Sequence, residues 1–208
     1  MNPELLNILE KVAALYMKYG IKSITMDDVA RELGMSKKTL YQYVENKNDL
    51  VEKVVDYVIN LKECDFKRID DINMNAVEKL IEVNMHIVTS MKDYNPATEY
   101  DLKKYYPELY AKMHSIRRQR MYDSILANIK KGKEEGLYRE ELNEEIIARM
   151  QVSRFMNMHE DELLTKNDMQ RSAFIHELFI YHIRGIANEK GLNVLEETLK
   201  KINFTNYL

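Results

Sequence analysis

The stretch TMDDVARELGMSKKTLYQYV, residues 25–44, decides the fold class that we expect for this chain. Thr25 is followed three residues later by Asp28, which is the spacing of a helix N-cap and its partner in a capping box. Gly34 ends this short helix, and Ser36 has the residue type of the next N-cap. The stretch therefore predicts two short helices that are joined by a tight turn containing glycine.

The side chains of this stretch divide into an inner and an outer set. Val29, Ala30 and Leu33 recur at helical spacing and form the inner face of the first short helix. Leu40 and Val44 do the same for the second. The positions left outside on the second helix are polar, charged or aromatic: Lys37, Thr39, Gln42 and Tyr43.

Longer helices are expected on both sides of this pair. Apolar residues from Leu5 to Tyr16 recur every three or four positions and predict a first helix that ends at Gly20. Asn46 suits the cap of a fourth helix, which should continue to about residue 66. Two short helices braced by a longer one form a helix-turn-helix, whose second helix can enter the major groove of DNA.

The rest of the chain is also expected to be helical. Only 6 glycines and 3 prolines interrupt the 208 residues, and the apolar residues keep a helical period almost throughout. A short segment at 97–105 precedes a long helix that starts at Pro107. The further helices are predicted at 75–93, 107–133, 143–163, 169–188 and 192–202. The fold class is therefore all-α, with a helix-turn-helix domain at 1–66, which includes the linking helix 47–66, and a larger helical domain at 67–208.

Composition excludes several classes of protein. A single cysteine excludes a disulfide framework, and the charges spaced through the first twenty residues leave no signal peptide or membrane span. We therefore expect a soluble, cytoplasmic protein with no membrane partner. A net charge of −3 excludes a polycationic nucleic-acid coat, so any DNA contact must come from a local cluster. Lys37, Lys38 and Lys47 outweigh Glu45, which leaves about +2 on a short element.

Residues 8–55 resemble the N-terminal domain of the TetR family of bacterial transcriptional regulators. The matching features are the break at Gly20, TMDDVA at 25–30, LGMSKKTLYQYV at 33–44 and NKNDL at 46–50. The resemblance implies a DNA-binding domain followed by a larger helical domain that dimerises and holds a small molecule. Residues 68–208 have no comparable motif.

The resemblance also implies which residues meet DNA. The candidates are Thr25, Ser36, Lys37, Lys38, Thr39, Tyr41, Gln42, Tyr43 and Lys47. Thr25 resembles the family position that binds a DNA phosphate through its hydroxyl and the helix N-terminus. Contacts with base edges are expected from Lys37, Lys38, Thr39 and Gln42, because Lys can donate to guanine acceptors and Gln can form two hydrogen bonds with adenine. Tyr41, Tyr43 and Lys47 would contact the backbone. For Tyr41, packing in the core is an equal alternative.

Two further sites follow from the resemblance. The last two long helices would form half of a four-helix bundle between two chains, with interface residues Met150, Phe155, Phe174, Leu178, Tyr181 and His182. Tyrosines and methionines of the larger domain can line an adaptable, mostly apolar pocket. The pocket candidates are Met85, Tyr100, Tyr105, Tyr110, Met113, His114 and Met121.

We expect a homodimeric regulator that binds a palindromic double-stranded DNA operator. It would be a repressor that a small hydrophobic or aromatic effector releases by changing the spacing of the two DNA-reading helices. An alternative is a helix-turn-helix protein that is constitutive or that answers to a protein partner. We do not expect an enzyme, a cofactor or a metal site, because His176-Glu177 is followed by Ile180 where a second zinc-binding histidine would stand.

Overall fold

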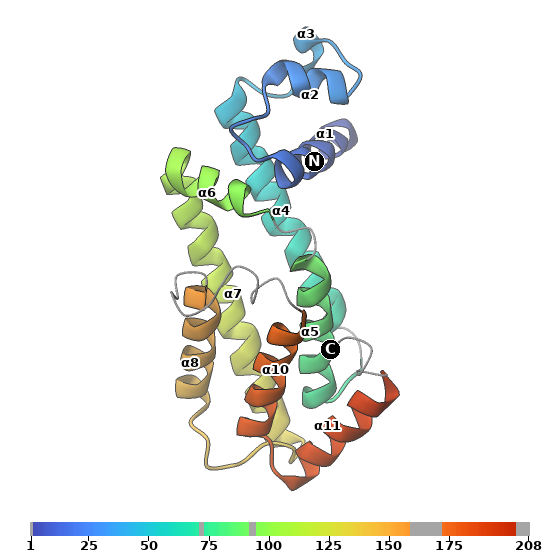
Figure 1. The fold of residues 1–208 in the computed structure, drawn as a ribbon, viewed down its shortest axis with the longest axis vertical. Helices are drawn as coiled ribbons and strands as arrows, with labels where there is room; N and C mark the ends of the chain where they lie inside the picture. The colour runs from blue at the N-terminus through green and yellow to red at the C-terminus, as the bar shows by residue number, and fades with distance from the viewer. Residues whose placement is uncertain (1, 71–72, 92–94, 159–171, 203–208) are drawn as a thin grey trace. The chain divides into compact units, whose positions relative to one another are not determined.

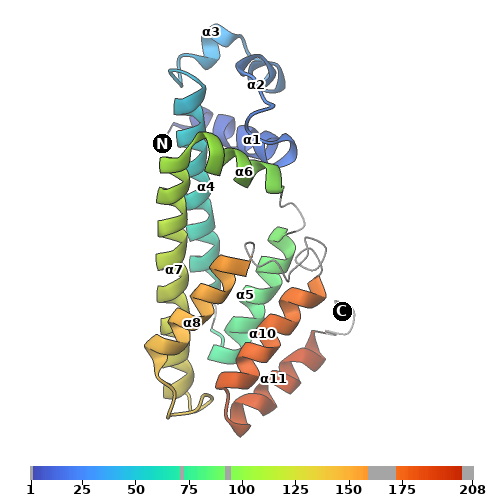
Figure 2. The same ribbon diagram turned by 60° about the vertical axis from the view of Figure 1, so that its left-hand side comes forward.

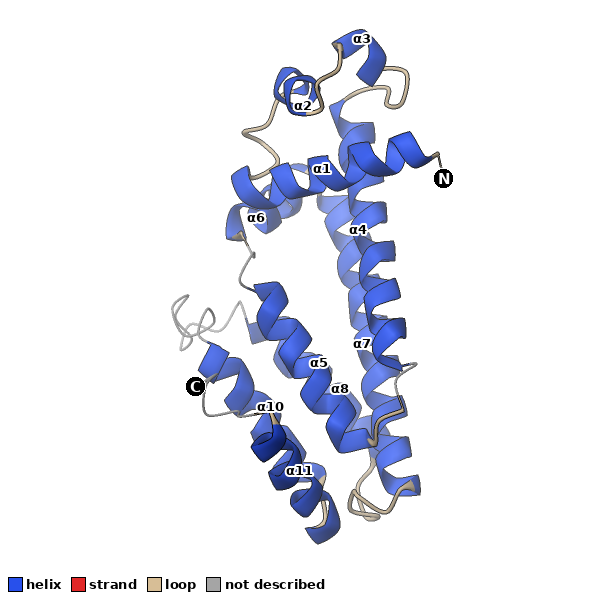
Figure 3. Ribbon diagram, turned by 90° about the vertical axis from the view of Figure 1, so that its right-hand side faces the viewer, coloured by secondary structure: helices blue, strands red, loops and turns tan. Residues whose placement is uncertain are grey.

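The computed structural model describes residues 2–70, 73–91, 95–158 and 172–202 (Figures 1 and 3). Its helices are α1 (Pro3–Tyr19), α2 (Met26–Glu32), α3 (Lys37–Leu40), α4 (Lys47–Asp70), α5 (Ala76–Met91), α6 (Pro96–Tyr105), α7 (Pro107–Glu134), α8 (Glu144–Asn157), α10 (Ser172–Ile186) and α11 (Glu189–Lys201). Strands are absent from these ranges, where an isolated bridge joins Tyr138 to Ala187. The prediction of an all-α fold is confirmed.

The helices differ from the prediction in several places. Helix α3 ends at Leu40, four residues before the predicted inner residue Val44, and the chain continues as a turn. The segment at 97–105, for which no helix was predicted, forms most of helix α6. Helix α8 ends at Asn157, and residues 159–171 lie outside the described ranges. No described helix combines the length and the apolar run that a bilayer crossing requires.

The chain divides into two compact units. Unit 1 contains residues 1–66 and 93–115, and unit 2 contains residues 67–92 and 116–208. The first break follows residue 66. Helix α6 and the start of α7 group with the helix-turn-helix in unit 1. The chain therefore passes between the units after residues 66, 92 and 115.

Unit 1 is built around the apolar face of α1, which crosses the first half of α4 (Figure 3). Asn2 caps α1 by accepting a hydrogen bond from the Glu4 N–H at 2.9 Å, and Gly20 ends the helix with φ 81°. The buried residues of this core come from α1, α2, α3, α4 and α6 and from the connections before α2 and after α3: Ile8, Leu9, Val12, Tyr16, Ile21, Ile24, Val29, Ala30, Leu40, Val44, Leu50, Val51, Val54, Val55 and Leu102. Leu40 and Val44 are buried, as predicted.

Helix α6 is fixed to the C-terminal end of α1 by side-chain hydrogen bonds. The Asn95 amide donates to the Lys18 carbonyl at 3.0 Å, and the Thr98 hydroxyl donates to the Tyr16 carbonyl at 2.6 Å. The buried Asp101 carboxylate accepts from the Lys22 N–H at 2.7 Å. The Tyr16 carbonyl also accepts from the Gly20 N–H at 2.9 Å, so α6 adds further partners to backbone groups at this helix end.

In unit 2, α5, α10 and α11 lie side by side (Figure 2). One hydrophobic cluster joins them to the turn after α7: Ala76, Val77, Leu80, Ile81, Leu137, Tyr138, Ile183, Ile186, Ala187 and Leu195. A second cluster is formed by Val88, Met158, Ile175 and Phe179. The faces of α5 and α10 therefore supply most of the buried apolar surface of this unit.

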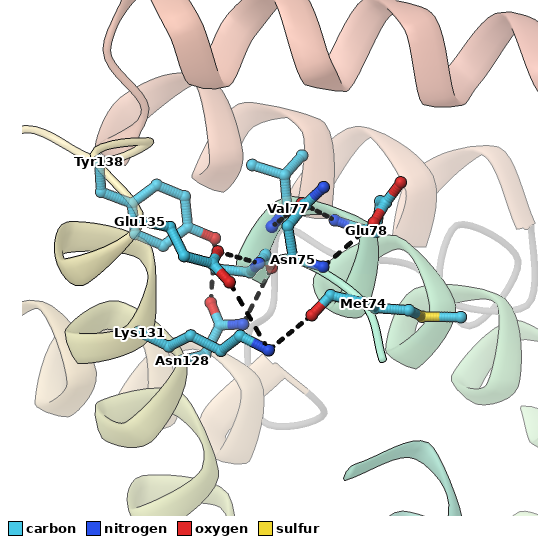
Figure 4. A network of polar contacts seen from close by, with 9 residues as sticks. Met74, Asn75, Val77, Glu78, Asn128, Lys131, Glu135 and Tyr138 are labelled. Atoms are coloured by element: carbon cyan, nitrogen blue, oxygen red, sulfur yellow. Dashed lines mark hydrogen bonds and ion pairs between the residues drawn. The ribbon is translucent and has the colours of Figure 1, made fainter. Parts of the chain in front are cut away.

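A polar network connects the start of α5 to the end of α7 (Figure 4). The Glu135 carboxylate accepts from the Ala76 N–H at 2.8 Å, and the Asn128 amide donates to the Ala76 carbonyl at 2.9 Å. The Tyr138 hydroxyl donates to the Asn128 side-chain oxygen at 3.0 Å. Asn128 and Tyr138 are buried, so these bonds satisfy polar groups that would otherwise destabilise the core.

Gly132→Ala is expected to destabilise the protein. A Cβ at this position of α7 would lie 2.1 Å from the Tyr138 ring, which is itself held by the Asn128 hydrogen bond. Overpacking of this kind costs about 1–3 kcal/mol in free energy of unfolding. Urea denaturation of the variant measures the loss.

Gly185→Ala in α10 is the matched control. A Cβ at Gly185 has no neighbour within 4 Å among the described atoms, so the better helix propensity of Ala should raise stability by up to about 1 kcal/mol. Equal effects of the two variants would contradict the proposed clash at Gly132.

Candidate nucleic-acid interface

Thr25 and Asp28 form the capping box that the sequence predicted at the start of α2. The Thr25 hydroxyl accepts from the Asp28 N–H at 3.2 Å, and the Asp28 carboxylate accepts from the Thr25 N–H at 3.0 Å. The same carboxylate accepts from the Thr25 hydroxyl at 2.6 Å. These hydrogen bonds hold the pKa of Asp28 below its ordinary value. The exposed Thr25 hydroxyl therefore already has two partners within the helix start.

Ser36 caps α3 in a similar way. Its hydroxyl accepts from the Thr39 N–H at 3.1 Å and lies 2.8 Å from the Thr39 hydroxyl. Leu40 is fully buried and anchors the single turn of helix in the core of unit 1. The cap and the anchor together fix which side chains of α3 face outward.

The turn after α3 presents Tyr41 and Gln42 to solvent. Tyr41 is 47% exposed, so its ring does not pack in the core, and the alternative of a core role is wrong for this residue. Gln42 is exposed as well. Tyr43 is half-buried against the core, and a hydrogen bond with the Glu4 side chain raises the pKa of its phenol. Tyr43 is thus tied to α1, while Tyr41 and Gln42 are available to a ligand.

The two lysines of α3 have different surroundings. The Lys37 ammonium lies 2.9 Å from the Asp27 carboxylate of α2, and this contact raises the pKa of Lys37. Lys38 is exposed and takes part in none of the ion pairs between described residues. Asp27 was not among the residues expected to act here, because it is ten positions away from Lys37 in the sequence and belongs to another helix.

Lys47 is directed into unit 1 and away from solvent. Its ammonium donates to the carbonyl oxygens of Ile21 at 2.7 Å and Ile24 at 2.5 Å, and lies 3.4 Å from that of Lys22. Burial lowers the pKa of this half-buried side chain. Lys47 therefore holds the connection between α1 and α2, which differs from the phosphate contact that we expected of it.

The exposed candidates that remain are Lys37, Lys38, Tyr41 and Gln42, with Thr25 at the start of α2, and together they form the candidate DNA-facing surface. Figures 1 and 2 show α2 and α3 together at one end of unit 1, on the far side of α1 from α6. The surface combines ammonium, phenol and amide groups on a short, well-anchored element. Such a set can donate hydrogen bonds to phosphates and to base edges.

The seven pocket candidates are divided between the two units. Tyr100, Tyr105, Tyr110, Met113 and His114 belong to unit 1, whereas Met85 and Met121 belong to unit 2. In unit 1, two of them are at the surface and three are half-buried around the core cluster. The larger helical domain was expected to hold the whole set, and the grouping of residues 93–115 with unit 1 separates it.

A depression of about 390 Å³ lies in unit 2 at helices α7 and α8. It is lined by Arg118, Gln119, Tyr122, Arg149, Val152 and Ser153. These residues are mostly polar, and none of the pocket candidates is among them. Within the described residues, no three His, Cys, Asp or Glu side chains are placed to share a metal ion.

The six interface candidates are placed differently from one another. Met150 and Tyr181 are 63% and 69% exposed. Ile146, one helical turn before Met150 on α8, is 54% exposed. Phe155 is half-buried, with its ring centroid 5.4 Å from that of Phe179. Phe174 and Leu178 are also half-buried against the cluster that contains Phe179.

His182 does not lie on an exposed face. It is 8% exposed within the single chain, which contradicts its assignment to a surface that a partner could cover. Burial, together with the nearby Arg154 guanidinium, lowers the pKa of His182 to about 4. This histidine is therefore a neutral core residue at neutral pH.

Residues 8–54 match the family described as bacterial regulatory proteins, tetR family. The chain is 23% identical over 184 residues to the uncharacterized HTH-type transcriptional regulator YvaF of Bacillus subtilis (strain 168), which covers 88% of this chain and 95% of that protein. These matches confirm the resemblance seen in residues 8–55. They are to regulators of transcription, as expected for a DNA-binding protein that is not an enzyme.

Solved structures with this fold include two that cover nearly the whole chain. A TetR family transcriptional regulator from Agrobacterium tumefaciens has a TM-score of 0.65 at 15% identity and covers 89% of this chain and 98% of that one. The ketosteroid transcriptional regulator KstR2 of Mycobacterium tuberculosis has a TM-score of 0.53 at 16% identity and covers 91% of this chain and 97% of that one. At these identities, the likeness concerns the fold.

His182→Gln is expected to make the protein less sensitive to acid. The folded-state pKa of about 4 lies below the ordinary value of about 6.5, so the unfolded chain binds more protons between these pH values. Stability is therefore present above about pH 6.5 and is lost as the pH falls toward 4. Between pH 7 and pH 5 this histidine should account for a loss of about 2 kcal/mol.

Urea denaturation of both proteins at pH 7 and pH 5 measures this difference. The variant should lose less free energy of unfolding than the wild type over the same interval. An equal loss in both proteins would show that His182 titrates normally and is not held in the core.

Proposed function

This chain belongs to the TetR family of bacterial transcriptional regulators, and from that premise we propose that it is a repressor that binds a palindromic operator as a homodimer. We further propose that a small hydrophobic or aromatic effector releases it from DNA. The observation that carries the first proposal is the exposed set on and after α3, which Leu40 and the Ser36 cap hold in place.

The proposed contacts follow from the chemistry of each side chain. Lys38 and Lys37 are suited to guanine acceptors or phosphates, and the Gln42 amide is suited to adenine. Tyr41 is suited to the sugar-phosphate backbone, and Thr25 brings the N-terminus of α2 to a phosphate. The half-buried Tyr43 and the carbonyl-bound Lys47 are assigned to support of this surface, since both are already engaged within unit 1.

A dimer is proposed because one turn of α3 can read only a few base pairs. Two copies that bind two half-sites about one helical turn apart would multiply the specificity. The exposed apolar side chains of α8 and α10, namely Ile146, Met150 and Tyr181, support this proposal as the face that a second copy would cover. His182 is left out of this face.

Selection from a random duplex library is expected to enrich a two-fold symmetric site. Lys38→Ala should weaken binding to that site and reduce the salt slope of the logarithmic affinity by about one, because one phosphate or base contact is lost. Lys200→Ala on α11 removes the same charge from unit 2 and should leave both quantities unchanged. Fluorescence anisotropy at several salt concentrations measures the affinities.

Met150→Lys tests the proposed dimer. The variant should be monomeric in sedimentation equilibrium. In fluorescence anisotropy, it should lose more affinity for the full symmetric site than for an isolated half-site. Enrichment of no symmetric site by the wild type, or a variant that remains dimeric, would contradict this part of the proposal.

The effector proposal is supported by the interior of unit 2. Phe155, Phe174 and Phe179 lie in or against an apolar cluster, and the fully buried Asn84 amide lies 2.8 Å from the His176 imidazole nitrogen, which adds a polar group to that interior. KstR2, which has the same fold, is named as a ketosteroid regulator. A small apolar ligand with one polar group is therefore the class that we would test first.

The chain connectivity supports a way to transmit the effector signal. The chain passes between the units three times, after residues 66, 92 and 115, and two of these passages lie inside α4 and α7. Helix α6 is bonded to the end of α1 and to the Lys22 N–H that precedes α2. A ligand that favours one position of these helices would thereby change the fraction of protein that is competent to bind DNA.

A thermal-shift screen of apolar compounds against the purified protein tests this proposal. A true effector should raise the melting temperature and weaken operator binding, and Asn84→Leu should reduce both effects. A compound that stabilises the protein but leaves operator affinity unchanged would contradict effector-driven release. If a broad library contains no stabilising compound, control by a protein partner, or none at all, becomes the better hypothesis.

A further inference from the structure

The contact between Asp27 and Lys37 lies on the outer surface of the helix-turn-helix. Asp27 is the second residue of α2, Lys37 is the first residue of α3, and the carboxylate and ammonium are 2.9 Å apart. The side chains are 61% and 52% exposed, so the pair is not part of the core. It joins the two helices, and Lys38, Tyr41 and Gln42, on and directly after α3, are exposed as well.

We propose that Asp27 determines how selectively this protein binds DNA, by keeping the Lys37 ammonium from general attraction to phosphates and directing it to base edges. This inference rests on the proposed function, since it concerns the same DNA-facing surface. It assigns different tasks to two adjacent lysines, Lys37 and Lys38.

Sequence-independent affinity comes from cations that displace condensed counterions from the phosphates. A lysine with a carboxylate at 2.9 Å brings almost no net charge to the DNA, so Lys37 should contribute little to this attraction. Lys38, which has no ion-pair partner among the described residues, should contribute fully. The measured slope of affinity against salt separates these two cases.

Recognition of a base edge makes a different demand on the side chain. It requires a donor that is already held in one direction, because a flexible lysine loses rotamer freedom when it binds. Asp27 provides this restraint from the neighbouring helix. Since exposed ion pairs are weak, the Lys37 ammonium can still exchange one oxygen partner for another when the correct base is present.

Selectivity is the ratio of operator affinity to non-operator affinity. An aspartate that lowers the non-operator affinity and leaves the operator contact in place raises this ratio. For a protein that has a net charge of −3 and few free cations on its DNA-facing surface, one neutralised lysine is a substantial part of the local charge.

The test compares variants on the selected operator and on a non-operator duplex of equal length, at several salt concentrations. Asp27→Asn should tighten non-operator binding about threefold or more at low salt and steepen the salt slope by about one. Operator affinity should rise less, so the selectivity ratio should fall. In a Lys37→Gln background, Asp27→Asn should raise the non-operator affinity less than it does in the wild type.

Glu32→Gln is the matched control for charge alone. Glu32 is an exposed carboxylate of the same helix and lies about 140° around it from Asp27. Its removal should change non-operator binding less than the removal of the Asp27 carboxylate. Equal effects of the two variants, or an undiminished Asp27→Asn effect in the Lys37→Gln background, would overturn the proposal and leave Asp27 as a simple repulsive charge.

A second comparison leaves α2 intact, and so remains decisive if Asp27→Asn disturbs folding. Lys37→Gln should reduce the non-operator salt slope less than Lys38→Gln, which should reduce it by about one. Equal reductions would overturn the proposal. If the wild type fails to distinguish operator from non-operator duplex, the proposed function is wrong, and the non-operator slopes still decide whether Asp27 neutralises Lys37.

Discussion

The DNA-facing surface depends on helix caps, because α2 and α3 have only seven and four residues. Helices of this length are not stable by themselves in water. The Thr25 and Ser36 hydroxyls satisfy backbone N–H groups at the two helix starts, and Leu40 anchors the second helix in the core. Thr25 and Ser36, which were predicted to contact DNA, therefore also stabilise the two short helices that carry the candidate surface.

The connection before α2 is held from two sides. The Lys47 ammonium at the start of α4 binds the carbonyls of Ile21 and Ile24, and the Asp101 carboxylate of α6 binds the Lys22 N–H. Both attachments are made to backbone groups, so they constrain the path of the chain whatever side chains the connection has. Helix α4 continues into unit 2, and so does the segment that contains α6. The connection before α2 is therefore bonded to two segments that link the units.

Local features of this fold could be predicted from the sequence, because their partners are a few residues apart. The Thr25 and Asp28 capping box and the Gly20 helix end are of this kind. Features that need two distant segments were not predicted, such as the Lys47 contacts with the α1–α2 connection and the grouping of α6 with unit 1. Residue spacing within one helix contains no information about which other segment will lie opposite.

The interface residues show a second limit of sequence reasoning. Helix α10 has large apolar side chains on most of its circumference, so helical periodicity could identify the element but not which side is buried. Tyr181 and His182 are neighbours in sequence, yet the first is 69% exposed and the second 8%. The side chains of α10 that are buried in unit 2 are those on the face that packs against α5. Which face this is depends on how all the helices of the unit pack.

The same reasoning separates the two lysines of α3. Lys37 and Lys38 are identical in type and adjacent in sequence, so a count of charges gives them equal weight. Their electrostatic environments differ because Asp27, a residue outside α3, lies beside only one of them. An ammonium that is free adds to attraction for any DNA, whereas one held by a carboxylate adds mainly where a base can replace that partner. Selectivity on so short a reading helix is then determined as much by a neighbouring residue that touches no base as by the side chains that do.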